Sequence, residues 1–84
     1  MKWEQTRRTE NRICWTTVTA KGALFRLRAT QVAETVVLEL YRTDRAGALT
    51  DRRGGWKETI ANPSGDLDPI KNIALTWAAL RVGA

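Results

Sequence analysis

Histidine is absent from this chain, and cysteine occurs only once, at position 14. Histidine is the side chain that exchanges protons most readily near neutral pH, so its absence removes the Ser-His-Asp and Cys-His arrangements of nucleophilic catalysis. One cysteine without histidine also leaves too few ligands for structural zinc. The carboxylates lie beside arginines or at the start of a predicted helix. We therefore expect a protein that is not an enzyme and that uses no metal or other cofactor.

Long apolar stretches are missing as well. No run of about 18 apolar residues occurs, so the sequence predicts no transmembrane span and no membrane partner. No apolar segment follows Met1-Lys2, and we expect no signal peptide. The lone Cys14 cannot form an intrachain disulfide, which favours a reducing compartment, and its apolar neighbours predict a buried thiol. A soluble, cytoplasmic protein with one small domain is the expectation for these 84 residues.

The positive charge is unevenly distributed. The chain carries 14 basic and 9 acidic residues, which gives a net charge of +5 at pH 7. Residues 1–30 hold the whole excess, because the charges of residues 31–84 cancel. A second local excess lies between Asp44 and Lys57, around two adjacent glycines. Clustered cations suit a polyanionic partner, either a nucleic acid or an acidic protein surface, and ordinary solubilising charge is the alternative.

Four segments have the pattern of β-strands. The clearest is residues 23–30, in which apolar side chains alternate with Arg26 and Arg28. Residues 34–42 alternate in the same way, which places Glu39 across from one of the two arginines. Residues 12–20 are instead rich in β-branched and aromatic side chains. The predicted strands are residues 12–20, 23–30, 34–42 and 56–61, and residues 1–11 are expected to be a polar arm or an edge strand.

The end of the chain predicts a helix. Asp68 is a suitable N-cap, and Pro69 fits the first helical position because its missing N–H would have no partner there. Apolar residues follow at helical spacing and form one stripe, made of Ile70, Ile73, Ala74, Trp77 and Leu80. We therefore predict an α+β fold in which a four-stranded antiparallel sheet is followed by a C-terminal helix packed on one face (ββββα). Residues 12–84 form this single domain.

Candidate binding residues combine cations with aromatic rings, because cations bind phosphates and bases stack on rings. Arg26, Arg28 and Tyr41 share one face of the predicted sheet. A basic loop of residues 42–57 is expected at its rim, with residues 44–55 as a polar loop or open hairpin. Trp15 lies either on this face or in the core. The candidate nucleic-acid-binding residues are Trp15, Arg26, Arg28, Tyr41, Arg45, Arg52, Arg53, Trp56 and Lys57, of which Trp56 is either a stacking residue or an anchor for the fourth strand.

The order of elements resembles the transcriptional-coactivator and whirly type of single-stranded DNA-binding protein. The resemblance covers roughly residues 12–82, through Leu24-Phe25-Arg26-Leu27-Arg28, Val36–Arg42, Arg52-Arg53-Gly54-Gly55-Trp56 and the helix from Asp68. It implies a curved four-stranded sheet with one helix, dimerisation through that helix, and single-strand binding by the sheet and the basic loop. The link of residues 62–67 before the helix is longer than is usual in that family.

Three functions are compatible with these patterns. The first is a small nucleic-acid-binding protein with a slight preference for single-stranded DNA or RNA, acting as a homodimer through the C-terminal helix. The alternative is a protein-interaction module, such as a small phage-type or accessory inhibitor or adaptor, that docks on an acidic patch of a larger protein. The third is an assembly subunit whose apolar face oligomerises. The charge and the aromatic residues favour the first of these.

Overall fold

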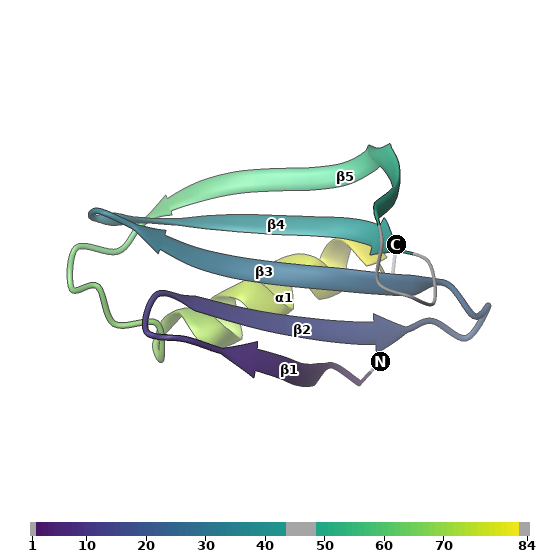
Figure 1. Ribbon diagram of the computed structural model, residues 1–84, viewed down its shortest axis with the longest axis horizontal. Coiled ribbons are helices and arrows are strands. Elements are labelled where there is room, and N and C mark those ends of the chain that lie inside the picture. The colour runs from purple at the N-terminus through teal and green to yellow at the C-terminus, as the bar shows by residue number, and fades with distance from the viewer. Residues whose placement is uncertain (1, 44–48, 83–84) are drawn as a thin grey trace.

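An antiparallel sheet and one helix make up the part of the chain that the computed structural model describes, which is residues 2–43 and 49–82, without the side chains of residues 49–54. The strands follow one another in chain order, so that β1 and β5 form the two edges (Figure 1). The elements are β1 (Glu4–Arg8), β2 (Arg12–Val18), β3 (Leu24–Val32), β4 (Thr35–Thr43), β5 (Leu49–Ala61) and α1 (Ile70–Val82).

The α+β class, the antiparallel sheet and the C-terminal helix confirm the prediction, but the sheet has five strands rather than four. The additional strand is β1, which lies in the segment that the sequence left open as an arm or an edge strand. All of its residues are exposed, so it has no apolar alternation to reveal it. Its backbone pairs with β2 from Glu4 opposite Thr16 to Arg8 opposite Ile13, with an irregularity between Gln5 and Arg7.

Of the loop or open hairpin predicted within residues 42–57, the loop is wrong for residues 49–57, which are strand, and the open hairpin agrees with the pairing of β4 and β5. Strand β4 continues to Thr43, and β5 begins at Leu49, whose Cα lies opposite that of Thr43. The pairing register shifts between Leu40 and Arg42, where Trp56 and Asp51 are the respective partners on β5. The glycines that indicated a loop therefore lie within an irregular strand, because a strand that deviates from regular pairing tolerates Gly readily.

The core lies between one face of the sheet and α1, which crosses behind the strands in Figure 1. The alternation predicted for β3 and β4 is confirmed, because Leu27, Leu38 and Leu40 are fully buried on this face. The prediction for the helix holds in part, since Ile73 and Leu80 of the apolar stripe are 51% and 69% exposed. The helix contributes Ile70, Ala74, Trp77 and Ala78 to the core, and Leu67 joins them from the preceding link.

Asn62 holds the connection between β5 and α1 in place. Its side-chain amide donates hydrogen bonds to the side-chain oxygen of Gln31 at 2.8 Å and to the carbonyl of Asp66 at 3.0 Å. The Gln31 amide donates in return to the Asn62 carbonyl at 3.0 Å. Because Asn62 is buried, these bonds replace water and set the direction in which the chain enters the helix. Among the described residues, no helix is long and apolar enough to cross a membrane.

The turn between β3 and β4 holds one non-glycine residue, Ala33, in a strained backbone conformation. Val32 pairs with Thr35 across a two-residue turn whose first residue, Ala33, has a φ of 55°. This left-handed region favours glycine. We expect Ala33→Gly to raise the free energy of unfolding by about 0.5–1 kcal/mol, after the larger unfolded-state entropy of glycine is subtracted. Thermal unfolding measures this increase in stability. The control is Ala20→Gly in the β2–β3 turn, where φ is not positive, and it should not raise the stability.

Edge strand β1 is joined to the start of α1 by an ion pair. A guanidinium nitrogen of Arg8 lies 2.7 Å from the Asp68 carboxylate, and the Lys71 ammonium lies 3.5 Å from the same oxygen. The hydrogen bond from Arg8 and its charge hold the pKa of Asp68 below its ordinary value of 3.8; desolvation opposes this effect, and Lys71 adds to it.

A depressed pKa in the folded state gives stability that is present above the unfolded pKa and lost as pH falls through the folded pKa. We therefore expect Asp68→Asn to be less stable than the wild type at neutral pH. The difference should shrink as pH falls below about 3.8. Denaturant titrations at several pH values measure this, and high salt should reduce the difference because the pair is exposed. Glu34→Gln serves as a control of equal charge change.

Candidate nucleic-acid interface

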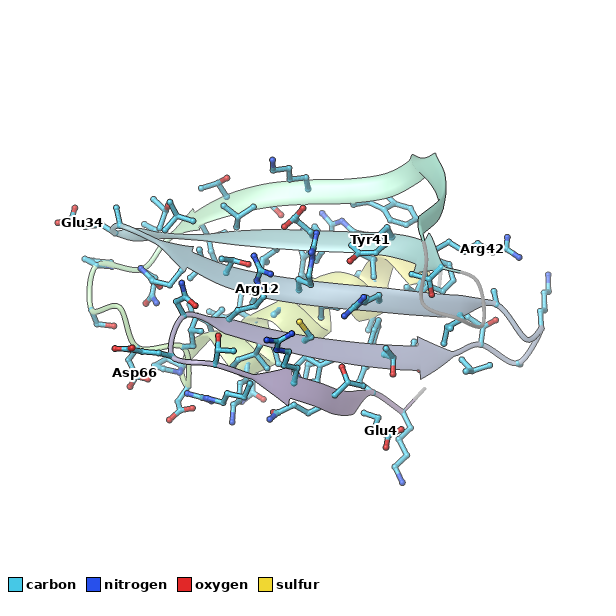
Figure 2. The ribbon with its side chains drawn as sticks, viewed as in Figure 1. Glu4, Arg12, Glu34, Tyr41, Arg42 and Asp66 are labelled. Atoms are coloured by element: carbon cyan, nitrogen blue, oxygen red, sulfur yellow. The ribbon has the colours of Figure 1, made fainter. Side chains whose placement is uncertain are left out.

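The sheet face opposite α1, here called the open face, has no described element covering it (Figure 2). Side chains alternate along each strand, so the neighbours of the buried core residues point to this face. Figure 2 shows Arg12 and Tyr41 on it. Among the described side chains, it carries five basic residues against two acidic ones, Glu4 and Glu39. The basic residues are Arg7, Arg12, Arg26, Arg28 and Lys57.

The centre of the open face is a cluster of arginine and tyrosine side chains. Arg26 lies directly opposite Tyr41 in the β3–β4 register. The Arg28 guanidinium carbon lies 5.2 Å from the centre of the Tyr41 ring, a cation–π distance. Both arginines are half-buried, and their Nε atoms have no contact with solvent. Such packed cations have little side-chain freedom left to lose when a ligand binds.

One row of residues crosses all five strands of the open face. The register places Arg7 opposite Cys14, Cys14 opposite Arg28, Arg28 opposite Glu39, and Glu39 opposite Lys57. Because neighbouring strands lie about 4.8 Å apart, the three cations of this row recur at about 10 Å across the sheet. The Cys14 side chain is buried in this row, as the sequence predicted.

Trp15 does not belong to this surface. It is 4% exposed and packs in the core with Ile13 and Leu27, so it faces α1. Its neighbours Cys14 and Thr16 point to the open face instead, which is the reverse of the orientation that would have placed the indole beside the arginines. The prediction that Trp15 lies on the open face is therefore wrong, and its alternative as a core residue is confirmed.

Trp56 also lies on the side of the sheet that faces α1. Its partner in the register is Leu40, a core residue, and its ring is 39% exposed at the edge of the sheet. The neighbouring Lys57 points to the open face. Among the other candidates, Arg52 and Arg53 lie in β5 with their side chains outside the described part of the structure, and Arg45 lies outside the described residues altogether.

Arg7 and Arg12 lie on the open face, although the sequence did not mark them as candidates. Arg12 donates a hydrogen bond from Nε to the Thr30 hydroxyl at 3.1 Å, which holds its side chain over β3. Arg12 is two residues from Cys14 and four from Thr16, so the alternation along β2 places all three on one face. The sequence did not show which face of β2 is buried, and Arg12 could not be assigned to the open face without that knowledge. Arg7 could be assigned to this face only if β1 was known to be a strand, and the sequence of β1 has no apolar alternation that would predict one.

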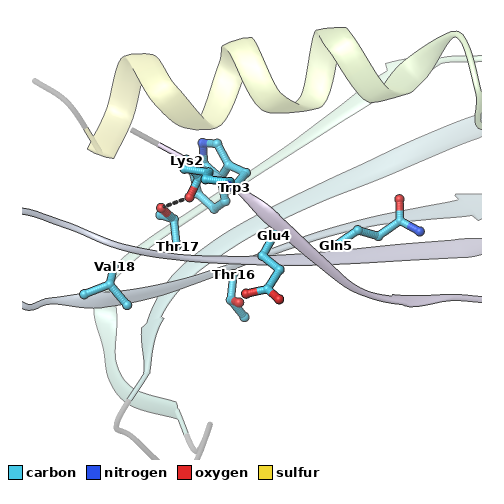
Figure 3. Close-up of a pocket in the computed structure, with 7 residues that line it drawn as sticks. All are labelled: Lys2, Trp3, Glu4, Gln5, Thr16, Thr17 and Val18. Atoms are coloured by element: carbon cyan, nitrogen blue, oxygen red, sulfur yellow. Dashed lines mark hydrogen bonds between the residues drawn. The ribbon is translucent and has the colours of Figure 1, made fainter.

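A hollow of about 660 Å³ opens where β1 begins (Figure 3). Trp3 lies on its helix side, and Glu4 and Thr16 point the other way. The Thr17 hydroxyl is engaged by a 2.6 Å hydrogen bond to the Lys2 carbonyl. The hollow thus offers hydroxyl, amide and single charged groups without a nucleophile–base pair among its described lining, which is Lys2, Trp3, Glu4, Gln5, Thr16, Thr17 and Val18.

Comparison with known proteins gives no relative: no family model, no curated protein and no solved structure matches this chain. The resemblance to the transcriptional-coactivator and whirly type stays a prediction. What the open face can bind is therefore inferred from the residues that it carries. Those residues are arginines, a lysine, a tyrosine and hydroxyls on an open antiparallel sheet, which together can bind phosphates and stack a flat ring.

Proposed function

We propose that this protein binds single-stranded nucleic acid on the open face of its sheet, without catalysis. The observation that carries the proposal is the gathering of five described basic side chains on this face, around Tyr41. The arginine guanidinium binds phosphate through bidentate hydrogen bonds, and an aromatic ring beside it offers a stacking surface for a base. A flat surface of this kind suits an extended strand, whose bases are free to stack, better than a duplex, whose bases are already paired.

The direct test is a binding titration with a short fluorescent oligothymidylate, followed by fluorescence anisotropy. We expect a Kd of about the micromolar range at low salt, and a steep loss of affinity as salt rises, since each neutralised phosphate contributes about −0.7 to the logarithmic salt slope. Tryptophan emission is a poor readout here because Trp15 and Trp77 are buried and Trp56 lies on the other side of the sheet. Absence of binding at low salt would overturn the proposal.

The exposed side of α1 supports a second proposal, that the protein contacts another protein, either as a homodimer or as an interaction module. Ile73 and Leu80 are exposed one heptad apart, and the exposed positions between them carry no charge. Arg81 borders this surface, but its charge is engaged: its guanidinium carbon lies 4.2 Å from the centre of the Trp77 ring and a nitrogen lies 3.6 Å from the Glu58 carboxylate. Solution mass measurement tests the dimer, and capture from nuclease-treated lysate tests an acidic protein partner in the cytoplasm.

A further inference from the structure

Arg28, the central cation of the open face, is already paired. One of its guanidinium nitrogens lies 3.3 Å from the Glu39 carboxylate, and both side chains are 29% exposed. The same guanidinium lies over the Tyr41 ring. A phosphate that approaches Arg28 therefore meets a cation whose charge is balanced, and a base that approaches Tyr41 meets a ring that is partly covered.

Glu39 occupies a position that no other described carboxylate shares. On one side it faces Arg28 and on the other it faces Lys57 in the strand register, so it lies between two cations of the same row. Glu4, the other acidic residue of the open face, is instead at the edge on β1, opposite Thr16. Removing either carboxylate changes the net charge equally, but only Glu39 touches an arginine of the cluster.

We infer that Glu39 is an internal competitor for the phosphate group and so sets the affinity and salt dependence of the open face. When a strand binds, Arg28 exchanges the carboxylate for a phosphate and uncovers Tyr41 for stacking. Because the Glu39 carboxylate is held in contact with Arg28, its effective concentration at the guanidinium is high, and it competes with a phosphate from solution. This inference rests on the proposed function, since it concerns the same ligand at the same surface.

The salt dependence separates this competition from a general effect of charge. In the wild type, Arg28 is neutralised by Glu39, so its transfer to a phosphate releases no extra counterion. In Glu39→Gln, the free Arg28 adds one charge contact, and we expect the logarithmic salt slope to steepen by about 0.7. Affinity for the oligothymidylate should rise about two- to fivefold at low salt, as expected for the loss of a half-exposed ion pair. Glu4→Gln should leave the slope unchanged.

The experiment measures oligothymidylate binding between about 50 and 200 mM salt for the full chain and for Glu39→Gln, Glu4→Gln, Arg28→Gln and the Arg28→Gln/Glu39→Gln pair. In the Arg28→Gln background, Glu39→Gln should no longer raise the affinity for the oligothymidylate. The difference between its effects in the two backgrounds measures the coupling between positions 28 and 39. Glu39→Thr is a second variant suited to a strand, and circular dichroism checks that each variant is folded.

Each outcome decides the inference. A gain and a steeper slope in Glu39→Gln that depend on Arg28 support it. If the wild type binds but Glu39→Gln behaves like Glu4→Gln, or keeps its gain without Arg28, the inference is overturned and the proposed function stands. If only Glu39→Gln binds, the internal competitor is supported and the proposed function of the wild type fails. If neither binds, both are overturned.

Discussion

Replacing Arg26 and Arg28 together by glutamine should lower the affinity for a single-stranded oligonucleotide by about 10- to 100-fold at low salt. Each charge-assisted contact to a phosphate contributes about 1–2 kcal/mol, and part of the contribution of Arg28 is offset because Glu39 competes for it. The salt slope should also become shallower by about 0.7, because Arg26 no longer displaces a counterion, whereas Arg28, neutralised by Glu39, displaces none in the wild type. Anisotropy titrations at several salt concentrations measure both quantities.

The matched control removes the same charge from the other side of the sheet. Arg8 and Arg81 are engaged in ion pairs with Asp68 and Glu58 and do not reach the open face. We expect Arg8→Gln/Arg81→Gln to weaken binding by no more than about threefold, through the long-range field alone. An equal loss in the two double variants would contradict a localised interface and would leave only a general effect of net charge.

The comparison with Arg52 and Arg53 tests where the interface is centred. These residues lie in the most visible basic segment of the sequence, which was expected to be a loop or an open hairpin, and they belong to strand β5. Arg26 and Arg28 lie on the central strand of the sheet and are held by packing. We expect Arg26→Gln/Arg28→Gln to weaken binding at least as much as Arg52→Gln/Arg53→Gln. The reverse order would move the centre of the interface to β5.

The parts of the fold that could be predicted are those with a clear period of two. Strands β3 and β4 alternate between apolar and polar residues over most of their length, so their two faces could be predicted. The alternation placed Glu39 across from either Arg26 or Arg28, and the structure pairs it with Arg28. Strand β1 was not, because a fully exposed edge strand is held by backbone hydrogen bonds and needs no apolar face. In β5, glycines and charges resemble a loop, although the backbone pairs with β4 as far as Leu49.

The candidate interface was predictable to the same extent. Arg26, Arg28 and Tyr41 lie on the well-patterned strands β3 and β4 and share the open face, which Lys57 of β5 joins through the register. Strand β2 offers no such guidance, because each of its faces presents apolar side chains next to threonines. Which face is buried is decided by the helix that packs on it. The bulkier set, which includes Ile13 and Trp15, fills the space against α1, and hence Trp15 was misplaced.

Trp15→Ala should therefore be among the most destabilising single substitutions in the protein. A tryptophan that is 4% exposed leaves a large cavity when truncated, and we expect a loss of about 3–5 kcal/mol in the free energy of unfolding. Domains of this size have a total stability of about 4–13 kcal/mol, so the variant should be close to unfolding at moderate temperature. Thermal and denaturant unfolding measure the change, and Trp56→Ala, at the exposed edge of the sheet, should lose much less.

The same tryptophan separates a core role from a binding role. Trp15→Phe keeps an aromatic ring in the core and should remain folded, at a smaller loss in stability than Trp15→Ala because more of the volume is filled. Since the side chain faces α1, the folded Trp15→Phe protein should bind the oligothymidylate with the affinity of the wild type. A folded Trp15→Phe variant that loses binding as strongly as Arg26→Gln/Arg28→Gln would place the ligand on the side of the helix. The open face would then no longer be the interface, because Trp15 points to the opposite side of β2 from the arginines.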